Sequence, residues 1–193
     1  MSVKTENFSK VPVNSADELR KWLAEHHAQA ESVWLVTFKK STPDRYVSTG
    51  EVLDELLAYG WIDGLRRKLD EQRTMQLISP RQAQHWSKTY KERVAKLEKE
   101  GRMAEPGRAA VECSKANGMW NFLDDVDALI QPEDLQKALD AQPEAKKNFN
   151  GFPTSKQRFA LRWIKLAKSE KARGNRIQKT VDCALEGKGV PGS

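Results

Sequence analysis

The stretch from Tyr59 to Ser87, YGWIDGLRRKLDEQRTMQLISPRQAQHWS, constrains the fold of this chain more than any other part of its sequence. We interpret residues 61–63 and 66–68 as short strand pieces on either side of a glycine. The run RTMQLIS predicts a second strand. Pro80 follows this run and ends it, because proline has no N–H to donate to a ladder. The stretch therefore predicts strands that pair through short connections.

Outside this stretch the apolar residues mostly follow helical spacing, with one further strand. Residues 32–40, SVWLVTFKK, are rich in β-branched and aromatic side chains and too short for a typical helix. The predicted fold class is therefore α+β: a small antiparallel β-sheet packed with helices, followed by a C-terminal bundle of short α-helices. We expect an α+β domain at 1–130, a helical domain at 131–186 and a flexible tail at 187–193.

Capping boxes, in which a Ser or Thr precedes a Glu or Gln by three residues, mark the starts of three predicted helices. They are Ser15 with Glu18, Ser48 with Glu51, and Thr154 with Gln157. The C-terminal part contains four predicted helical segments, at 132–139, 143–149, 154–168 and 171–185. In the third segment we assign Phe159, Trp163 and Leu166 to the core, because they share one helical face.

Composition excludes several classes of protein and site. The longest apolar runs of the 193 residues are far too short to cross a bilayer, so we expect no membrane span. The first ten residues lack the apolar core of a signal peptide, and we therefore expect a cytoplasmic protein. Cys113 and Cys183 form no disulfide framework, and with three scattered histidines they offer no metal-type spacing. We expect no metal and no cofactor.

Positive charge is concentrated near the C-terminus. The whole chain has a net charge of +6, and residues 151–186 alone contain nine Lys or Arg against three acids. Such asymmetry can indicate a nucleic acid or another polyanion as partner. The candidate residues for that alternative are Arg158, Arg162, Lys165, Arg173 and Arg176. A basic face opposite a core face is more often simply solvated, and no nucleic-acid-binding motif accompanies this one.

Four residues of the central stretch are candidate ligand-binding residues: Trp61, Asp63, Arg81 and Trp86. Asp63 precedes a glycine that permits close backbone approach, so it could bind a cationic or hydroxylated ligand, or satisfy N–H groups of a turn. Arg81 suits a carboxylate or phosphate, which it can bind through two parallel N–H groups. Trp61 and Trp86 could stack on a planar ligand, or lie in the core beneath the sheet.

The other bases of the central stretch cannot all join Arg81 at one anion. Successive residues of a strand point to opposite faces of the sheet. Arg66 and Lys68 are therefore predicted on one face and Arg67 on the other.

A hydrolytic site is a third possibility. Ser79 or Ser87, His85 and Asp63 could form a nucleophile, base and acid. The sequence has no nucleophile-elbow pattern, however, and Ser87 has a simpler role as the N-cap of the next helix. We therefore assign no catalytic residue and favour a function that is not enzymatic.

A set of ordered motifs resembles a known family. The motifs are GWIDG at 60–64, SPR at 79–81, HWSK at 85–88, EGRM at 100–103 and NGMW at 117–120, followed by ALDAQPEAKKNF and RGNRI. Their order and spacing are similar to those of the YdeI/OmdA-like family (bacteriocin-protection, YdeI or OmpD-associated), from about Glu18 to Glu186. Tyr90 departs from the pattern, because relatives usually carry Asn there. The family pattern is also altered at Leu77-Ile78 and in KARGNR at 171–176.

The resemblance implies a helical OmdA-type domain at 131–186 and a link to resistance against bacteriocins and cationic antimicrobial peptides. It implies no particular reaction or cofactor. The resulting hypothesis is a non-catalytic cytosolic resistance or stress factor that binds a small ligand or a protein partner near Asp63, Arg81 and Trp86. Polyanion binding through the basic C-terminal helices is the alternative, and an undetected hydrolase is the third hypothesis.

Overall fold

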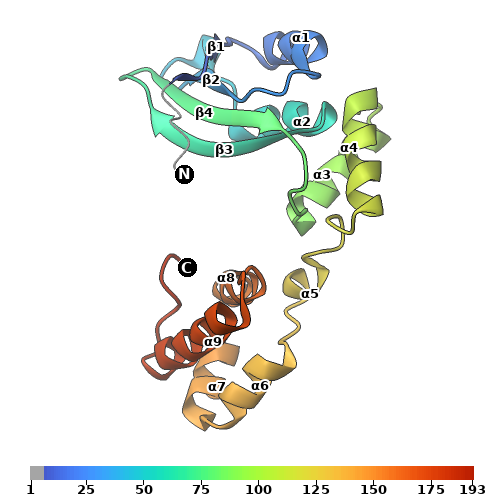
Figure 1. The fold of residues 1–193 in the computed structure, drawn as a ribbon. Coiled ribbons are helices and arrows are strands. Elements are labelled where there is room, and N and C mark those ends of the chain that lie inside the picture. The colour runs from blue at the N-terminus through green and yellow to red at the C-terminus, as the bar shows by residue number, and fades with distance from the viewer. Residues whose placement is uncertain (1–6) are drawn as a thin grey trace. The chain divides into compact units, whose positions relative to one another are not determined.

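The protein is α+β, as the sequence predicts, and its chain divides into two compact units, Met1–Asn121 and Phe122–Ser193. A computed structural model describes residues 7–193 (Figure 1). In the described range, no helix is both long and apolar enough to cross a membrane. Two core clusters belong to the first unit and one to the second. Each unit therefore has its own hydrophobic core.

Among the described residues, the first unit combines a four-stranded sheet with four α-helices and a short 3-10 turn at Pro43–Arg45. Its regular elements are β1 (Lys10–Pro12), α1 (Ala16–His26), β2 (Val33–Phe38), α2 (Thr49–Ala58), β3 (Trp61–Lys68), β4 (Arg73–Pro80), α3 (Lys88–Lys99) and α4 (Glu105–Ala116). The strand order is β1-β2-β4-β3. Strands β2, β4 and β3 pair antiparallel, whereas β1 pairs parallel to β2. The three predicted strands thus pair antiparallel as predicted, and the sheet is mixed because β1, a strand that the sequence did not predict, pairs parallel to β2.

The two strand pieces predicted around Gly64 form one continuous strand, β3, with a bulge. The register shifts between Asp63, which lies opposite Ile78, and Arg66, which lies opposite Gln76. A bulge of this kind adds a residue to one strand and re-aims its side chains. Asp63 and Arg66 consequently face the same side of the sheet. Arg67 faces the other side, where its guanidinium lies 5.5 Å from the Trp34 ring, so the predicted division of the bases is confirmed.

Helices α1 and α2 supply the main core of the first unit. Their buried leucines pack with Trp61 and Ile78 from the sheet. The capping box of α2 forms as predicted, because Ser48 accepts from the Glu51 N–H and Glu51 accepts from the Ser48 N–H. Trp61 is fully buried, and its indole donates to the His27 carbonyl at 3.3 Å. These contacts fix the start of β3 beneath the helices.

A buried carboxylate links three segments of the first unit. Glu55 of α2 is only 2% exposed. Its Oε2 accepts from Arg20 Nε of α1 at 2.8 Å, and its Oε1 accepts from Arg102 Nη2 at 2.7 Å, just after α3. Contact with Glu55 raises the pKa of both arginines. The carboxylate therefore stabilises the packing of α1 and of the α3 end on α2.

A Glu55→Gln variant is expected to lower the free energy of unfolding by about 2 kcal/mol, because hydrogen bonds to charged groups contribute about 1.5–3 kcal/mol. The amide keeps the size of the side chain but leaves two arginines without their shared anion. We place the loss toward the low end since both guanidinium groups are partly exposed. Urea unfolding of the full chain measures it. Glu98→Gln, at an exposed pair with Arg108, is the control and should change little; equal losses would contradict this role of Glu55.

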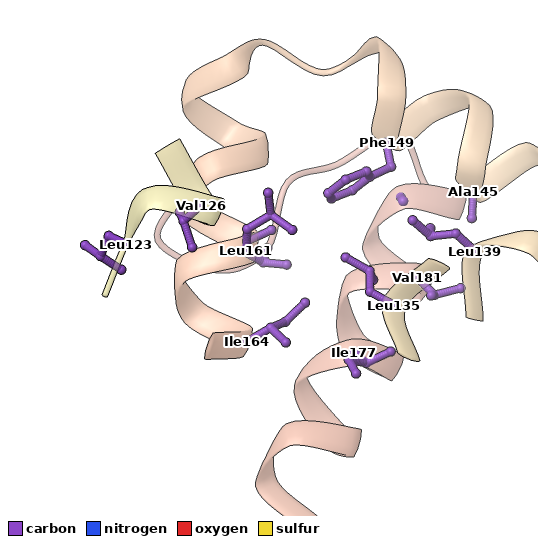
Figure 2. Packing of buried hydrophobic residues seen from close by; sticks show 13 residues of the cluster. Leu123, Val126, Leu135, Leu139, Ala145, Phe149, Leu161, Ile164, Ile177 and Val181 are labelled. Carbon is purple, nitrogen blue, oxygen red and sulfur yellow. The ribbon is translucent and has the colours of Figure 1, made fainter. Parts of the chain in front are cut away.

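The second unit is a bundle of short helices, and the four helical segments predicted there are confirmed. Its helices are α5 (Asp124–Asp127), α6 (Glu133–Asp140), α7 (Pro143–Gly151), α8 (Thr154–Lys165) and α9 (Glu170–Leu185). Figure 2 shows Leu135, Phe149, Leu161 and Val181 pointing into their common core. Val190, from the segment expected to be a flexible tail, is 4% exposed and belongs to the same core.

Two local predictions for α8 are wrong. Thr154 is not the cap: the cap position is Pro153, and no side chain bonds the first turn. Gln157 instead donates to the carbonyls of Asn150 and Phe152. The fully buried face consists of Ala160, Leu161 and Ile164, which were not predicted. Of the predicted core residues, Trp163 is partly buried against the same core, while Phe159 and Leu166 are each 38% exposed. The two stripes have similar helical spacing, and packing against the neighbouring helices selects between them.

Candidate functional site

The candidate site lies where β4 leaves the sheet and the chain turns into α3. The Arg81 N–H donates to the Gly60 carbonyl at 2.9 Å, and the Trp86 N–H donates to the Met119 carbonyl at 3.2 Å. These two bonds hold both ends of the short connection 82–85. The backbone therefore places Arg81 and Trp86 in fixed positions at one end of the first unit.

Arg81 is buried and stacked on aromatic rings. Arg81 is only 8% exposed. Its guanidinium carbon lies 3.8 Å from the Trp86 ring centroid and 5.4 Å from the Tyr90 ring centroid. One nitrogen, Nη1, donates to the carbonyl of Gln84 at 3.2 Å and lies 3.5 Å from that of His85. The connection to α3 thus orients the guanidinium through one of its three nitrogens.

The remaining donors of this cluster have no acceptor. Within residues 7–193, Arg81 Nε, Arg81 Nη2 and Trp86 Nε1 are shielded from solvent and lack any hydrogen-bond partner. Buried polar groups are nearly always paired, because each unpaired one costs about 1–3 kcal/mol and charged ones cost more. Burial lowers the pKa of Arg81 to about 10, with Tyr90 and Asp63 acting in the opposite direction. The cluster thus contains three unpaired donors, two on the Arg81 guanidinium and one on the Trp86 indole, and no anion among the described residues accepts a bond from them.

Asp63 is the nearby acid, and it is held by two donors. The Tyr90 hydroxyl donates to Asp63 Oδ1 at 2.6 Å, and Gln76 Nε2 donates to Oδ2 at 3.2 Å. Gln76 in turn accepts from Arg66 at 2.9 Å. Tyr90 therefore connects the two charged groups, because it bonds the acid through its hydroxyl and faces Arg81 with its ring. Asp63 lowers the electrostatic cost of burying Arg81 without bonding it.

Three of the four predicted ligand-binding residues come together here, and one does not. Asp63, Arg81 and Trp86 are joined through Tyr90. The Trp61 side chain packs instead in the core beneath the sheet, edge-on to Trp22 at 5.5 Å between ring centroids. Sequence reasoning missed Tyr90 as a member of the site, although its departure from the family pattern was the available signal.

The residues of the conceivable triad have other contacts. Asp63 bonds Tyr90 and Gln76, and the Ser79 hydroxyl lies 2.8 Å from that of Ser32. Ser87 occupies the cap position of α3 but makes no side-chain cap bond, so its predicted role as an N-cap is wrong in that respect. No described group of three or more His, Cys, Asp or Glu side chains could hold a metal ion.

Most of the candidate polyanion-binding bases contact groups of the second unit itself. Lys165 pairs with Asp125, and Arg173 pairs with Asp134 through two bonds of 2.6 and 2.9 Å. The bonds from Arg173 lower the pKa of the Asp134 carboxyl. Of the remaining bases, Arg176 donates to the Trp163 carbonyl and Arg162 has an interaction of its own, whereas Arg158 is exposed. The basic face therefore offers less free charge than the sequence suggests.

A shallow groove lies beside the candidate site, between α3 and α4. It has a volume of about 350 Å³. Lys91 and Lys115 place their ammonium groups 5.4 and 5.7 Å from the centroid of Trp120 on this groove. The Trp120 ring lies 5.0 Å from that of Trp86. The first unit thus has a second aromatic residue with cations beside it, and the exposed Lys115 provides a matched control for the buried Arg81.

Comparison with known proteins divides the chain in a similar way. Residues 128–187 match the family model described as Bacteriocin-protection, YdeI or OmpD-Associated (OmdA). Residues 11–110 match the model of a Domain of unknown function (DUF8412), and this range contains Asp63, Arg81, Trp86 and Tyr90. The resemblance expected from the motifs is thus confirmed for the C-terminal domain. No curated protein and no solved structure matches the chain.

Proposed function

Since the chain belongs to the DUF8412 family over half its length and carries a C-terminal domain of the Bacteriocin-protection, YdeI or OmpD-Associated family, we propose that it is a non-catalytic binding protein linked to bacteriocin protection. Its ligand carries an oxyanion group that Arg81 recognises. We place this activity in the cytoplasm. The family description supports the link to protection, and the geometry of the first unit supports the binding of an oxyanion.

One observation carries the proposal: two nitrogens of a buried guanidinium have no acceptor among the described residues. A charged donor in a shielded position is costly unless a partner of opposite charge reaches it. Carboxylate, phosphate and sulfate oxygens are the partners that arginine binds most strongly, and the bonds are often paired. A bound oxyanion would therefore supply what the protein itself does not supply at Arg81.

The surrounding groups favour binding over catalysis. The only acid in the cluster, Asp63, already accepts two hydrogen bonds. Trp86 and Tyr90 cover the guanidinium with aromatic surface, which excludes water and strengthens an ionic contact. Such an arrangement holds a charged group in place, and it provides no evident nucleophile or base for a reaction.

Thermal unfolding of the full chain in the presence of small oxyanions tests the proposal. We expect inorganic phosphate, sulfate or acetate, added at constant ionic strength, to raise the Tm in a saturable manner. A ligand that binds only the folded state stabilises it by about 2.7 kcal/mol at 100 times its Kd. Arg81→Gln should abolish this increase, because the amide lacks the charge and the paired donors.

Lys115→Met is the matched control, since it removes a cation from the neighbouring exposed groove. It should leave the response to oxyanions unchanged. The proposal fails if none of the three anions raises the Tm of the parent protein. It also fails if Arg81→Gln responds as the parent does, because the anion would then bind elsewhere.

A further inference from the structure

We infer that the oxyanion is a single carboxylate, held side-on by the Nε and Nη2 atoms of Arg81, with the Trp86 indole N–H as a third donor. This inference rests on the proposed function and narrows it from oxyanions in general to one class. It commits to a compact monoanion rather than a phosphate or sulfate group.

One edge of the Arg81 guanidinium has no hydrogen-bond partner in the part of the chain that the structure describes. Nε and the outer N–H of Nη2 lie on one edge of the planar group and point in parallel directions. The two oxygens of a carboxylate match this spacing and form two parallel bonds. The third nitrogen, Nη1, is already engaged by the Gln84 carbonyl at 3.2 Å. The two unpaired nitrogens of Arg81, Nε and Nη2, therefore form the edge of the guanidinium that a carboxylate can bind side-on.

The number of unpaired donors also fits a carboxylate. Trp86 Nε1 is also shielded and without a partner, on the ring that lies 3.8 Å from the Arg81 guanidinium carbon. An ionised carboxylate has two oxygens with about four lone-pair sites, so it can accept two bonds from the arginine and one from the indole. One such group would satisfy all three unpaired donors at once.

The charge of the site fits a monoanion. Arg81 supplies one positive charge, and Asp63 stands close enough to stabilise that charge electrostatically. A phosphate monoester carries about −1.5 to −2 charges at pH 7, so its second charge would be buried beside Asp63 without a cation. It would also bring further oxygens that need donors.

The test follows the Arg81 Nε–H resonance in nitrogen-15 spectra of the full chain, identified by its loss in Arg81→Lys. We expect sodium acetate to shift this resonance in a saturable manner. Inorganic phosphate at the same ionic strength should bind at least tenfold more weakly. Trp86→Phe keeps an aromatic ring but removes the indole N–H, and it should weaken acetate binding about five- to tenfold.

Arg81→Lys provides a second measurement that does not depend on a core substitution. Lysine keeps the positive charge but lacks the paired N–H groups of the planar guanidinium. Acetate binding, measured by calorimetry, should therefore weaken at least tenfold. Tighter binding of phosphate than of acetate at Arg81 would overturn the carboxylate assignment and leave the proposed oxyanion function in place. A resonance that neither anion shifts would overturn both. Unchanged acetate affinity in a folded Trp86→Phe protein would remove Trp86 from the site and overturn the three-donor arrangement.

Discussion

An Arg81→Met variant is expected to unfold with a free energy equal to or above that of the parent protein, while it loses all binding of small oxyanions. Methionine has a similar length and fills an apolar position without any donor. Burial lowers the pKa of Arg81 well below its ordinary value, to about 10. At roughly 1.4 kcal/mol per pKa unit, keeping this side chain charged at neutral pH costs on the order of 3 kcal/mol.

The interactions that Arg81→Met loses offset only part of the stability gained by removing the buried charge. The Nη1 bond to the Gln84 carbonyl contributes about 1.5 kcal/mol, the low end for a bond to a charged group, and the 3.5 Å bond to the His85 carbonyl contributes less. Stacking on Trp86 contributes about 1 kcal/mol more, and methionine retains part of that contact. We therefore expect an unfolding free energy between that of the parent and about 1–2 kcal/mol above it. Replacing a buried, incompletely paired ion by an apolar group of similar volume is often neutral or stabilising.

Urea unfolding measures the stability, and a matched variant controls for the loss of an arginine. Arg93→Met removes a guanidinium that bonds Asp54 at 2.5 Å and the Gly50 carbonyl at 3.3 Å. It should lower the unfolding free energy by about 2 kcal/mol, because Asp54 is buried and loses its partner. If Arg81→Met loses as much as Arg93→Met, Arg81 is a structural residue and not a ligand site.

Among glycine-to-alanine substitutions in the first unit, Gly107→Ala is expected to lower the free energy of unfolding the most. A Cβ at Gly107 would lie 2.2 Å from the Ala58 carbonyl oxygen, far inside van der Waals contact. Helix α4 approaches the end of α2 closely there, and the Ala104 N–H donates to the same carbonyl at 3.0 Å. Backbone, not a flexible side chain, must move. We expect a loss of about 3 kcal/mol, at the upper end for overpacking.

Gly50→Ala is the control for this prediction. Gly50 also lies in the first turn of a helix, but a Cβ there would meet its nearest atoms, on Arg93, at 3.6 Å or more. It should be neutral or stabilise by up to about 1 kcal/mol, because alanine favours helix over glycine. Thermal unfolding of both variants decides the matter. Equal Tm values for Gly107→Ala and Gly50→Ala would contradict the close approach of α4 to α2.

The elements of this fold that were predictable are those with a strong local signal. Ser48 with Glu51 forms the α2 capping box, and the buried run of β2 lies where β-branched residues concentrate. Strand β1 was not predictable, because three residues show no periodicity and its parallel pairing depends on β2. The buried face of α8 was assigned wrongly for a related reason: two apolar stripes share the helical period, and only tertiary packing distinguishes them.

The candidate site was predictable in its location but not in its chemistry. The motif spacing placed Asp63, Arg81 and Trp86 in one stretch, and arginine chemistry suggested an anion. That Tyr90 bonds Asp63, and that two nitrogens of Arg81 remain unpaired, depends on side-chain geometry across β3, β4 and α3. Trp61 and Trp86 have similar local signals, yet one enters the core beneath the sheet and the other stacks on Arg81. No local pattern separates these two environments.

The most direct measurement is a crystal structure of the full chain grown in acetate at high resolution. We expect one acetate with its two oxygens 2.7–2.9 Å from Arg81 Nε and Nη2, the range of charge-assisted bonds. Trp86 Nε1 should donate to one of the same oxygens. Ordered water that bridges Arg81 Nε and Nη2 to protein carbonyls, with no acetate at the site, would contradict the assignment of Arg81 as the oxyanion-binding residue.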